Sequence, residues 1–399
     1  MVELRKNKIA IISTHPIQYN APLFKLLAQR GFVEIKVFYT WSQTANGVVY
    51  DPGFLTSRSW DIPLLDGYPY EFVMNTSTKP GSDRFWGIQN PSLVKKVLDY
   101  GPDAVWVYGW KFRSHLELIF RLYNKIPIWF RGDSTLLDEA NGFSVKKLIR
   151  KLLLRLLYKN IDLAFYFGQS NKDYFKKNGL QDNELVYAPH CIDNKRFSSQ
   201  ENTYEEKAFE WRTTLGLTPE HFVFLFAGKF ENKKAPDKLI SAFKKINNKN
   251  ARLLFVGNGP LEQDLKQSSS SDSRIFFLDF QNQSKMPVVY RLADVFILPS
   301  RGPGETWGLS LNEAMACSRP VIASDKCGAS RDLVSDDCGW VFNNDSEEEL
   351  LDILETCISN KALSKAMGRN SFDKIRNYSY EKVCEVIENR LNHKEYCLS

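Results

Sequence analysis

The sequence lacks the features that mark membrane-spanning and secreted proteins. Its 399 residues contain no apolar run near the roughly 18 residues that a bilayer-crossing helix needs. The first eight residues include four charged side chains and lead directly into an apolar, strand-like stretch, which is not the pattern of a signal peptide. We therefore predict a cytoplasmic protein whose membrane contact, if any, is peripheral on the inner face.

The sequence also lacks the cysteine patterns of disulfide frameworks and zinc sites. Its seven cysteines are an odd number, are scattered, and form no Cys-x-x-Cys pair. This usage predicts a reducing compartment.

A strong charge of one sign is missing as well. The 53 Lys and Arg residues nearly balance the 47 Asp and Glu residues, with a net charge of +6, which argues against a dedicated nucleic-acid-binding protein. A mildly basic chain suits an anionic substrate or an anionic membrane face. With 43% hydrophobic and 25% charged residues, the composition is that of an ordinary globular protein. The length predicts two domains with a cleft between them.

Short β-branched or aromatic runs alternate with amphipathic stretches along the whole chain, which predicts parallel sheets flanked by helices. The predicted strands are 8–14, 33–40, 69–74, 104–108, 127–131, 162–167, 184–188, 222–227, 252–256, 274–278, 294–298, 320–324 and 339–342. A polar stretch, 194–206, reads as an interdomain linker, and 268–271 as a loop. Residues 346–392 have helical spacing throughout and are expected to cover the sheet.

These patterns predict an α/β fold of two Rossmann-like, doubly wound domains that face each other across a cleft. We expect an acceptor-side domain over 1–195, a donor domain over 205–375, and a C-terminal helix over 376–399 that packs back towards the first domain. In such folds ligands bind at the carboxyl ends of the strands, which here means in the cleft.

Residues 298–324 carry the strongest chemical signal. A strand ends in a Gly/Pro-rich loop, a short helix starts near Gly308, and a second strand begins at Pro320. The free N–H groups at such a helix start can bind a diphosphate. Glu305 and Glu313 frame this start with seven residues between them. The spacing alone is weak evidence, because Glu347 and Glu355 share it in an ordinary solvated helix.

The same segment resembles the E-x7-E signature of retaining glycosyltransferases of family 4, which have the GT-B fold. Four further motifs resemble that family in its order along the chain: Tyr187-Ala-Pro-His-Cys-Ile-Asp193, Ala227-Gly-Lys-Phe-Glu-Asn-Lys-Lys234, Phe255-Val-Gly-Asn-Gly-Pro260 and Arg291-Leu-Ala-Asp-Val-Phe-Ile-Leu-Pro-Ser300. Departures occur at Ser318, where relatives often have Gly, and at Asp332, where they often have Glu.

The resemblance implies a role for each matching residue. Glu313 would accept hydrogen bonds from the ribose, and Glu305 would hold the donor sugar and stabilise its cationic centre. Lys229 and Lys234 would stabilise the charge that develops on the leaving diphosphate. Backbone N–H groups would grip the diphosphate, and the loop 279–283 would pass beside the base. The remaining donor-binding candidates are Gly228, Gly257, Asn258, Phe280, Gln281, Trp307, Gly308 and Leu309.

The first half supplies candidates for the acceptor side. His15 and Gln18 follow the first strand, in a His-Pro-Ile-Gln-Tyr form that resembles a subgroup of bacterial surface-polysaccharide transferases. Arg131 stands where relatives often have a His that touches the donor sugar. It either reads a different substrate, together with Asp133, or makes an internal pair with Asp133 or a helix terminus. Tyr108 follows the preceding strand and is a further candidate for the cleft.

Residues 143–159 form a basic amphipathic pattern in which six Lys or Arg residues are interleaved with seven Leu or Ile residues. Such a helix can lie on an anionic membrane. We favour the alternative, in which the Leu face packs on the sheet and the cations stay in water.

Taken together, the sequence predicts a retaining, metal-independent glycosyltransferase without cofactor. It would move a hexose from a nucleotide-diphosphate sugar, with UDP favoured, to a glycan or lipid-linked acceptor in cell-surface polysaccharide synthesis. The sequence contains no Asp-x-Asp metal motif. Two alternatives stay open: a nucleotide-sugar epimerase of related fold, and a non-catalytic nucleotide-sugar binding module.

Overall fold

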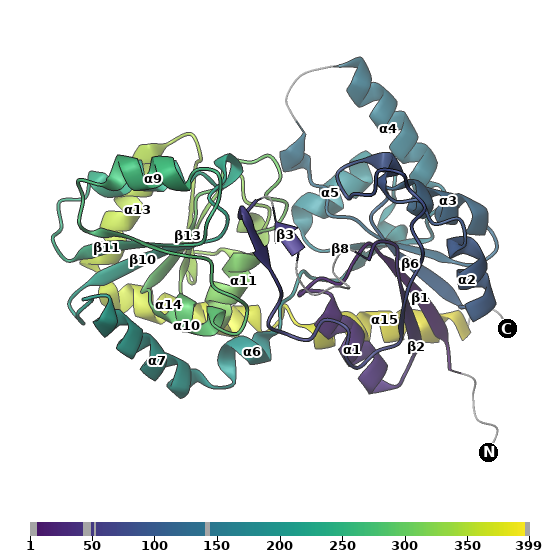
Figure 1. The fold of residues 1–399 in the computed structure, drawn as a ribbon, viewed down its shortest axis with the longest axis horizontal. Coiled ribbons are helices and arrows are strands. Elements are labelled where there is room, and N and C mark those ends of the chain that lie inside the picture. The colour runs from purple at the N-terminus through teal and green to yellow at the C-terminus, as the bar shows by residue number, and fades with distance from the viewer. Residues whose placement is uncertain (1–5, 43–48, 52, 140–143, 396–399) are drawn as a thin grey trace.

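The computed structural model describes residues 6–42, 49–51, 53–139 and 144–395, and it contains two α/β units side by side (Figure 1). The first unit is built on a parallel sheet with the strand order β5-β2-β1-β6-β7-β8-β9. These strands are β1 (Lys8–Ser13), β2 (Glu34–Tyr39), β5 (Tyr70–Phe72), β6 (Ala104–Tyr108), β7 (Ile128–Arg131), β8 (Leu163–Tyr166) and β9 (Leu185–Tyr187). The helices of this unit are α1 (Ala21–Arg30), η1 (Phe85–Gly87), α2 (Leu93–Tyr100), α3 (Arg113–Leu122), η2 (Leu136–Asp138), α4 (Val145–Tyr158), α5 (Gln169–Lys177) and η3 (Asp182–Glu184).

The central strands are buried on both faces, which is why they read as continuous apolar runs. Alternate residues of one strand point to opposite sides of the sheet. In β1, Ile9 and Ile11 pack with residues of α1. Their neighbours Ala10 and Ile12 pack with residues of α2 and α3 on the other face. Two separate apolar layers therefore hold this sheet.

The second unit repeats the architecture with the strand order β12-β11-β10-β13-β14-β15, again parallel. The strands are β10 (Phe222–Ala227), β11 (Ala251–Val256), β12 (Ile275–Leu278), β13 (Val295–Leu298), β14 (Val321–Ser324) and β15 (Gly339–Phe342). The helices are α6 (Asn194–Ser198), α7 (Glu201–Thr214), η4 (Asn232–Lys234), α8 (Pro236–Lys244), α9 (Glu262–Ser269), α10 (Met286–Arg291), α11 (Leu309–Ala316), α12 (Ser330–Leu333), α13 (Glu347–Ser359) and α14 (Lys361–Ile375). The predicted class, two doubly wound Rossmann-like domains, is confirmed.

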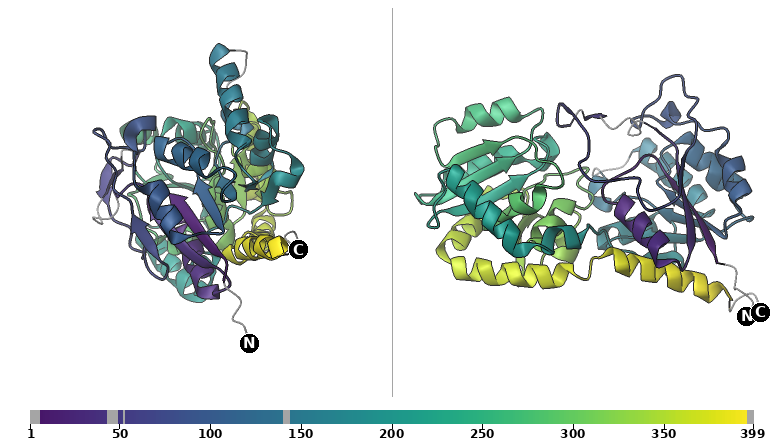
Figure 2. Two further views of the ribbon diagram at one scale, coloured as in Figure 1. Left: turned by 90° about the vertical axis from the view of Figure 1, so that its right-hand side faces the viewer. Right: turned by 60° about the horizontal axis from the view of Figure 1, so that its bottom comes forward.

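The last helix, α15 (Tyr380–Glu395), leaves the second unit and lies against the first, as the right-hand view of Figure 2 shows. Val383, Cys384 and Ile387 are buried in the apolar layer beneath α1. Arg30 at the end of α1 donates two hydrogen bonds of 2.6 Å to Glu388. The chain thus begins and ends in the same unit.

All thirteen predicted strands occur within two residues of their predicted ends, but three other predictions are wrong. The polar stretch expected to be a linker consists of α6 and the first part of α7. The expected loop at 268–271 begins inside α9. The third wrong prediction is that the Leu face of α4 packs on the sheet. The helix buries only Leu154, Leu157 and Tyr158, and its other apolar side chains face solvent.

The structure adds one feature that the sequence pattern did not suggest. An antiparallel hairpin of β3 (Val49–Asp51) and β4 (Thr56–Arg58) lies between the two units in Figure 1. Its strands are only three residues long, too short for an alternating pattern to identify.

The structure also describes the state of six cysteines and the character of the helices. Six cysteines are free and buried, and Cys397 lies outside the described residues, as does Phe143 of the predicted basic helix. Among the helices that the structure describes, none is both long and apolar enough to cross a membrane.

Candidate active site

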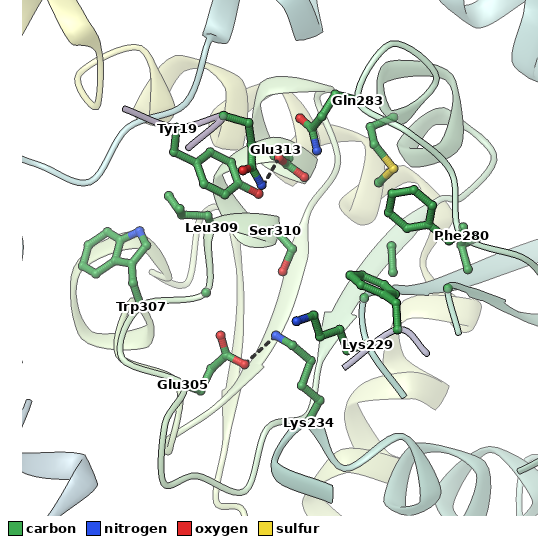
Figure 3. A pocket seen from close by; sticks show the side chains of 18 of the residues that line it. Tyr19, Lys229, Lys234, Phe280, Gln283, Glu305, Trp307, Leu309, Ser310 and Glu313 are labelled. Atoms are coloured by element: carbon green, nitrogen blue, oxygen red, sulfur yellow. Dashed lines mark hydrogen bonds and ion pairs between the residues drawn. The ribbon is translucent and has the colours of Figure 1, made fainter. Parts of the chain in front are cut away.

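A cleft with a volume of about 520 Å³ lies where the carboxyl ends of the two sheets meet. Its walls come from loops after β10, β11, β12 and β13 on one side and from the loops after β1 and β7 on the other. Parallel strands place all their carboxyl ends on one edge, which is why motifs distant in the sequence converge here (Figure 3).

Glu305 and Lys234 form a buried ion pair at the floor of the cleft. Lys234 Nζ lies 2.6 Å from Glu305 Oε2, and Ser300 donates a second hydrogen bond of 3.0 Å to the same oxygen. Burial alone would raise the pKa of Glu305, but the Lys234 ammonium outweighs it and holds that pKa below its ordinary value. The same attraction raises the pKa of Lys234 against the opposing effect of its burial. Both groups are therefore charged at neutral pH.

Glu313 occupies the opposite end of the site, on α11, and has no cationic partner within ion-pair distance among the described residues. Tyr290 donates a hydrogen bond of 2.7 Å to Oε2 of this carboxylate, and Tyr19 donates one of 3.1 Å to Oε1. Burial raises the pKa of Glu313, although the two hydroxyls and the more distant Arg196 oppose the shift. Hydroxyl groups are thus the natural partners of this carboxylate.

The start of α11 lies between the two glutamates. Gly308 has a φ of +100°, and a Cβ there would lie 2.7 Å from Leu298 Cδ2 and 2.8 Å from Cys327 Sγ. Only glycine fits this turn. It aims the first-turn N–H groups of the helix, which have no intrahelical acceptor, into the cleft. The hydroxyl of Ser310 lies beside them, buried and without a hydrogen-bond partner among the described residues.

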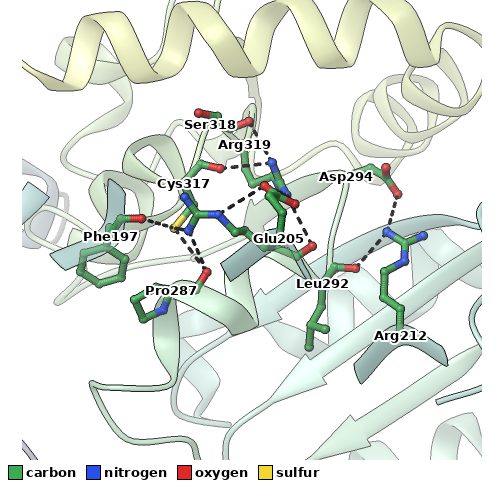
Figure 4. A network of polar contacts seen from close by, with 10 residues as sticks. Phe197, Glu205, Arg212, Pro287, Leu292, Asp294, Cys317, Ser318 and Arg319 are labelled. Atoms are coloured by element: carbon green, nitrogen blue, oxygen red, sulfur yellow. Dashed lines mark hydrogen bonds and ion pairs between the residues drawn. The ribbon is translucent and has the colours of Figure 1, made fainter. Parts of the chain in front are cut away.

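The far end of α11 is fixed by the polar network of Figure 4. Arg319, just beyond the helix, donates hydrogen bonds of 2.8 and 3.0 Å to Glu205 on α7. Arg291 on α10 lies 3.3 Å from the same carboxylate and donates to Cys317 Sγ at 3.0 Å. These contacts join α7 and α10 to the segment after α11, and so fix the C-terminal end of α11.

Lys229 follows β10 and reaches the cleft through the tight turn at Gly228. The backbones cross closely here, since a Cβ on Gly257 would lie 2.0 Å from the carbonyl oxygen of Gly228. Lys229 Nζ lies 2.9 Å from Asp51 Oδ1 on the β3–β4 hairpin of the other unit. A carboxylate of the first unit therefore pairs with a cation that lines the cleft.

An aromatic wall closes the end of the cleft beyond Lys229. Phe280, in the loop after β12, meets Phe54 of the hairpin edge to face at 4.9 Å between ring centroids. Trp60, Gln281 and Gln283 line the same end. The predicted Asn258 does not line the cleft. Its side chain accepts a hydrogen bond of 2.8 Å from the N–H of Phe280 and so positions this loop.

The candidates of the first half divide into two groups. Gln18 and Asp133 line the cleft, whereas His15, Tyr108 and Arg131 are not among its lining residues. Arg131 is buried and donates to the carbonyl groups of Ala188, at 3.1 Å, and Pro189, at 3.4 Å. No hydrogen bond or ion pair joins Arg131 directly to Asp133 or to a helix terminus in the described structure. Arg131 Nη2 instead lies 3.4 Å from His190 Nδ1, and His190 Nε2 lies 3.6 Å from Asp133 Oδ1. The tertiary fold instead assigns Arg131 to the chain segment that joins the two units.

Most of the residues that line the donor side of the cleft were predicted from the sequence, and several others were not. The structure brings together Gly228, Lys229, Lys234, Gly257, Phe280, Gln281, Glu305, Trp307, Gly308, Leu309 and Glu313. It adds Tyr19, Phe54, Trp60, His190, Gln283, Tyr290 and Ser310. Tyr19, His190 and Ser310 stand inside motifs already singled out, and Gln283 ends the loop 279–283 that was expected beside the base. Phe54, Trp60 and Tyr290 carry no local signal, because they reach the cleft only through tertiary contacts.

The described residues contain no cluster of three or more His, Cys, Asp or Glu side chains placed to hold a metal ion. The charged side chains that line the cleft include the Lys229 and Lys234 ammonium groups and the Glu305 and Glu313 carboxylates, and also those of Lys233, Glu231 and Asp133. They surround a helix start that favours an anion. This arrangement is suited to a ligand with a diphosphate between two hydroxyl-bearing groups.

Comparison with known proteins agrees with this geometry. Residues 207–374 match the family of glycosyl transferases group 1. The chain is 24% identical over 347 residues to a sulfoquinovosyl transferase of Arabidopsis thaliana, which covers 85% of this chain and 63% of the relative. It is 27% identical over 286 residues to the alpha-monoglucosyldiacylglycerol synthase of Acholeplasma laidlawii, with 69% of each chain covered. The chain thus spans less than two thirds of the sulfoquinovosyl transferase, and it covers 41% of a D-inositol 3-phosphate glycosyltransferase of Rhodococcus opacus.

Solved structures share the fold over nearly the whole chain. Anabaena HepE, in complex with UDP and glucose, has a TM-score of 0.69 at 18% identity and covers 97% of this chain and 100% of its own. The sucrose-phosphate synthase of Thermosynechococcus elongatus has a TM-score of 0.72 at 17% identity, with 99% and 100% covered. These similarities confirm the predicted GT-B fold.

Proposed function

Because residues 207–374 match the group 1 glycosyl transferases, we propose that this chain moves a hexose from a nucleotide-diphosphate sugar to an acceptor hydroxyl with retention of configuration. The single observation that carries the proposal is the cleft floor, where the Glu305–Lys234 pair and Glu313 lie on opposite sides of the α11 N-terminus. A diphosphate fits the helix start, and its two substituents then face the two carboxylates.

The proposed mechanism follows from the charges. As the bond between sugar and phosphate breaks, negative charge grows on the leaving diphosphate and positive charge on the anomeric carbon. The growing negative charge is stabilised by Lys229, Lys234 and the N–H groups of α11. The growing positive charge is stabilised by the Glu305 carboxylate. The hydroxyl of Ser310 is placed to donate to a phosphate oxygen. The departing phosphate takes the acceptor proton, so no protein nucleophile is assigned.

Glu313 is proposed to bind the ribose. Its oxygens already accept hydrogen bonds from the Tyr19 and Tyr290 hydroxyls, and the ribose hydroxyls offer the same chemistry. The aromatic end of the cleft, with Phe280 and Phe54, would hold the base.

UDP is the favoured donor nucleotide, since Anabaena HepE of the same fold is described with UDP and glucose. A GDP-mannose-dependent mannosyltransferase of Corynebacterium glutamicum, 28% identical over 223 residues, shows why the base needs a direct test. For the acceptor, we propose a glycan or lipid-linked hydroxyl of cell-surface polysaccharide synthesis, reached through the side of the cleft that Gln18 and Asp133 line. The diacylglycerol in the name of the Acholeplasma relative supports a lipid-linked acceptor.

The test is thermal unfolding of the purified protein in EDTA with UDP, GDP, ADP, CDP or dTDP. A nucleotide at about 100 times its dissociation constant adds roughly 2.7 kcal/mol and raises the midpoint by a few degrees. We expect one nucleotide, UDP, to do so in the parent and in Glu355→Gln, an exposed carboxylate on α13, but much less in Glu313→Gln. If no nucleotide shifts the parent, the donor site is refuted.

Incubation with the matching nucleotide sugar then separates the enzyme classes. A transferase releases nucleotide quickly only when acceptor is added, and the product keeps the donor's anomeric configuration. Conversion of the donor without acceptor would establish the epimerase instead. Nucleotide binding without any turnover would establish the binding module.

A further inference from the structure

Helix α4 presents an apolar face that no part of the described protein covers. Its exposed side chains are Val145, Leu148, Ile149, Leu152, Leu153 and Leu156, each 46% to 66% exposed. They follow the spacing i, i+3, i+4, i+7, i+8, i+11 and therefore form one continuous stripe. Six of the ten exposed Leu, Ile and Val side chains of the described residues lie on this helix.

The orientation of α4 is the reverse of an ordinary surface helix. Leu154, Leu157 and Tyr158 attach its C-terminal half to the sheet, while the longer apolar stripe points away from it. Figure 1 and the left-hand view of Figure 2 show the helix standing clear of the body of the molecule. Soluble proteins rarely leave such a stripe in water unless it binds something.

The charge of the helix identifies the partner. Residues 145–159 contain six Lys or Arg residues and no Asp or Glu. The whole chain has 53 cationic and 47 acidic residues, an excess of six, so 47 cations balance 47 acids everywhere else. The net charge of the protein therefore equals the charge of α4 together with its C-cap residue Lys159, and α4 is the helix whose apolar face is bare.

We propose that α4 is a docking element for the surface of an anionic lipid bilayer, with its apolar stripe in the acyl region and its cations at the phosphate level. Lys146 and Arg155 flank the stripe on its two sides, as interfacial helices require. A second copy of this chain fits less well, because pairing two such helices would bring two all-cationic segments together. The inference goes beyond transferase activity and does not depend on it.

The position of α4 relates the proposed membrane surface to the cleft. The preceding helix η2 ends at Asp138, whose Oδ1 accepts a hydrogen bond of 2.7 Å from the N–H of Gly304. Gly304 directly precedes Glu305. The docking helix thus follows a segment that contacts the rim of the site.

Co-sedimentation of the full chain with vesicles tests the proposal without donor or acceptor. We expect binding to phosphatidylcholine vesicles that contain phosphatidylglycerol, weakening as salt is added, and little binding to phosphatidylcholine alone. The triple variant Ile149→Ser, Leu152→Ser, Leu153→Ser should bind roughly 100-fold more weakly, through lost apolar insertion. Its matched control carries equally exposed substitutions on other helices, Leu98→Ser, Phe120→Ser and Phe209→Ser, and should bind like the parent.

A second triple variant tests the charges. Lys146→Gln, Lys151→Gln and Arg155→Gln should also weaken binding roughly 100-fold, since each cation near an anionic surface contributes about tenfold or less. Exposed lysines elsewhere, Lys207→Gln, Lys249→Gln and Lys382→Gln, serve as its control. Unchanged thermal unfolding shows that each variant is folded.

Several results would overturn the proposal. These are no binding of the parent to anionic vesicles, equal binding to neutral ones, or α4 variants that bind like their controls. Concentration-dependent dimerisation that the apolar α4 variant abolishes, without vesicle binding, would assign the stripe to a second copy instead.

Discussion

At the scale of single residues, the Glu305–Lys234 pair sets the electrostatic state of the cleft. Each partner is buried, so removing one leaves the other as an unpaired buried charge. We expect Glu305→Gln and Lys234→Met each to lower the free energy of unfolding by about 3 kcal/mol, and the double variant to cost clearly less than their sum. Denaturant unfolding of the parent, the two single variants and the double variant measures these free energies. The exposed pair Glu117–Arg121 is the control and should couple by less than about 1 kcal/mol.

The same pair has a definite pH dependence. The lowered pKa of Glu305 makes its stabilisation complete above the unfolded-state value, about 4.3, and lost as the pH falls through the folded-state pKa. The raised pKa of Lys234 makes its contribution complete below about 10.4 and lost as the pH rises through the folded-state pKa. The stability difference between the parent and the double variant should therefore shrink at both extremes. A difference that stays constant across this range would contradict the assignment.

Ser318 carries a conformational cost. It follows α11 with a φ of +57°, in the left-handed region that favours glycine. Ser318→Gly should stabilise the protein by about 0.5–1 kcal/mol and raise the unfolding midpoint by about 1–3 °C. Ser318→Ala, which cannot relieve the backbone, is the control. A midpoint that falls in the glycine variant would show that the serine side chain stabilises this turn.

At the scale of elements, the β3–β4 hairpin places a carboxylate where a diphosphate would compete for Lys229. Neutralising it in Asp51→Asn should tighten binding of the nucleoside diphosphate roughly three- to tenfold, because a competing ion pair of this exposure contributes about 1 kcal/mol. Titration calorimetry measures the affinity. Asp66→Asn, exposed and in the same unit, should leave it unchanged. Weaker binding in Asp51→Asn would mean that Asp51 supports the ligand rather than competes with it.

Secondary structure elements also show where local pattern is a sufficient guide. The apolar runs of β6 and β10 are predicted to the residue, because burial on both faces leaves no alternative pattern. The face of α4 was predicted wrongly. Its periodicity reveals an apolar stripe but not which side the sheet occupies, and here the shorter set, Leu154, Leu157 and Tyr158, makes the attachment.

At the scale of the molecule, hydrogen bonds between the two units, across the seam where they meet, hold them around the cleft. Asp332 accepts two hydrogen bonds of 3.1 Å from the N–H of Gln169, and Asp61 accepts from the N–H of Ser284 at 3.2 Å. Replacing both acids by alanine should open the cleft. We expect a larger radius of gyration in X-ray scattering and a several-fold weaker nucleotide affinity, with little change in thermal stability. Asp83→Ala, within one unit, is the control. An unchanged radius would show that the seam does not depend on these acids.

The sequence by itself determined the two parallel sheets, because the burial of each strand is recorded in a short apolar run. It identified the carboxyl-end motifs and the glutamates that frame α11 through their resemblance to a family, since spacing alone did not distinguish Glu305 and Glu313 from Glu347 and Glu355. Only the tertiary structure decided that Asp51 pairs with Lys229, that Arg131 serves the chain segment between the units, and that Tyr19 and Tyr290 meet Glu313. These contacts join residues up to 294 positions apart. It also decided the exposed face of α4, since the packing of one face against the sheet depends on where the rest of the chain places that sheet.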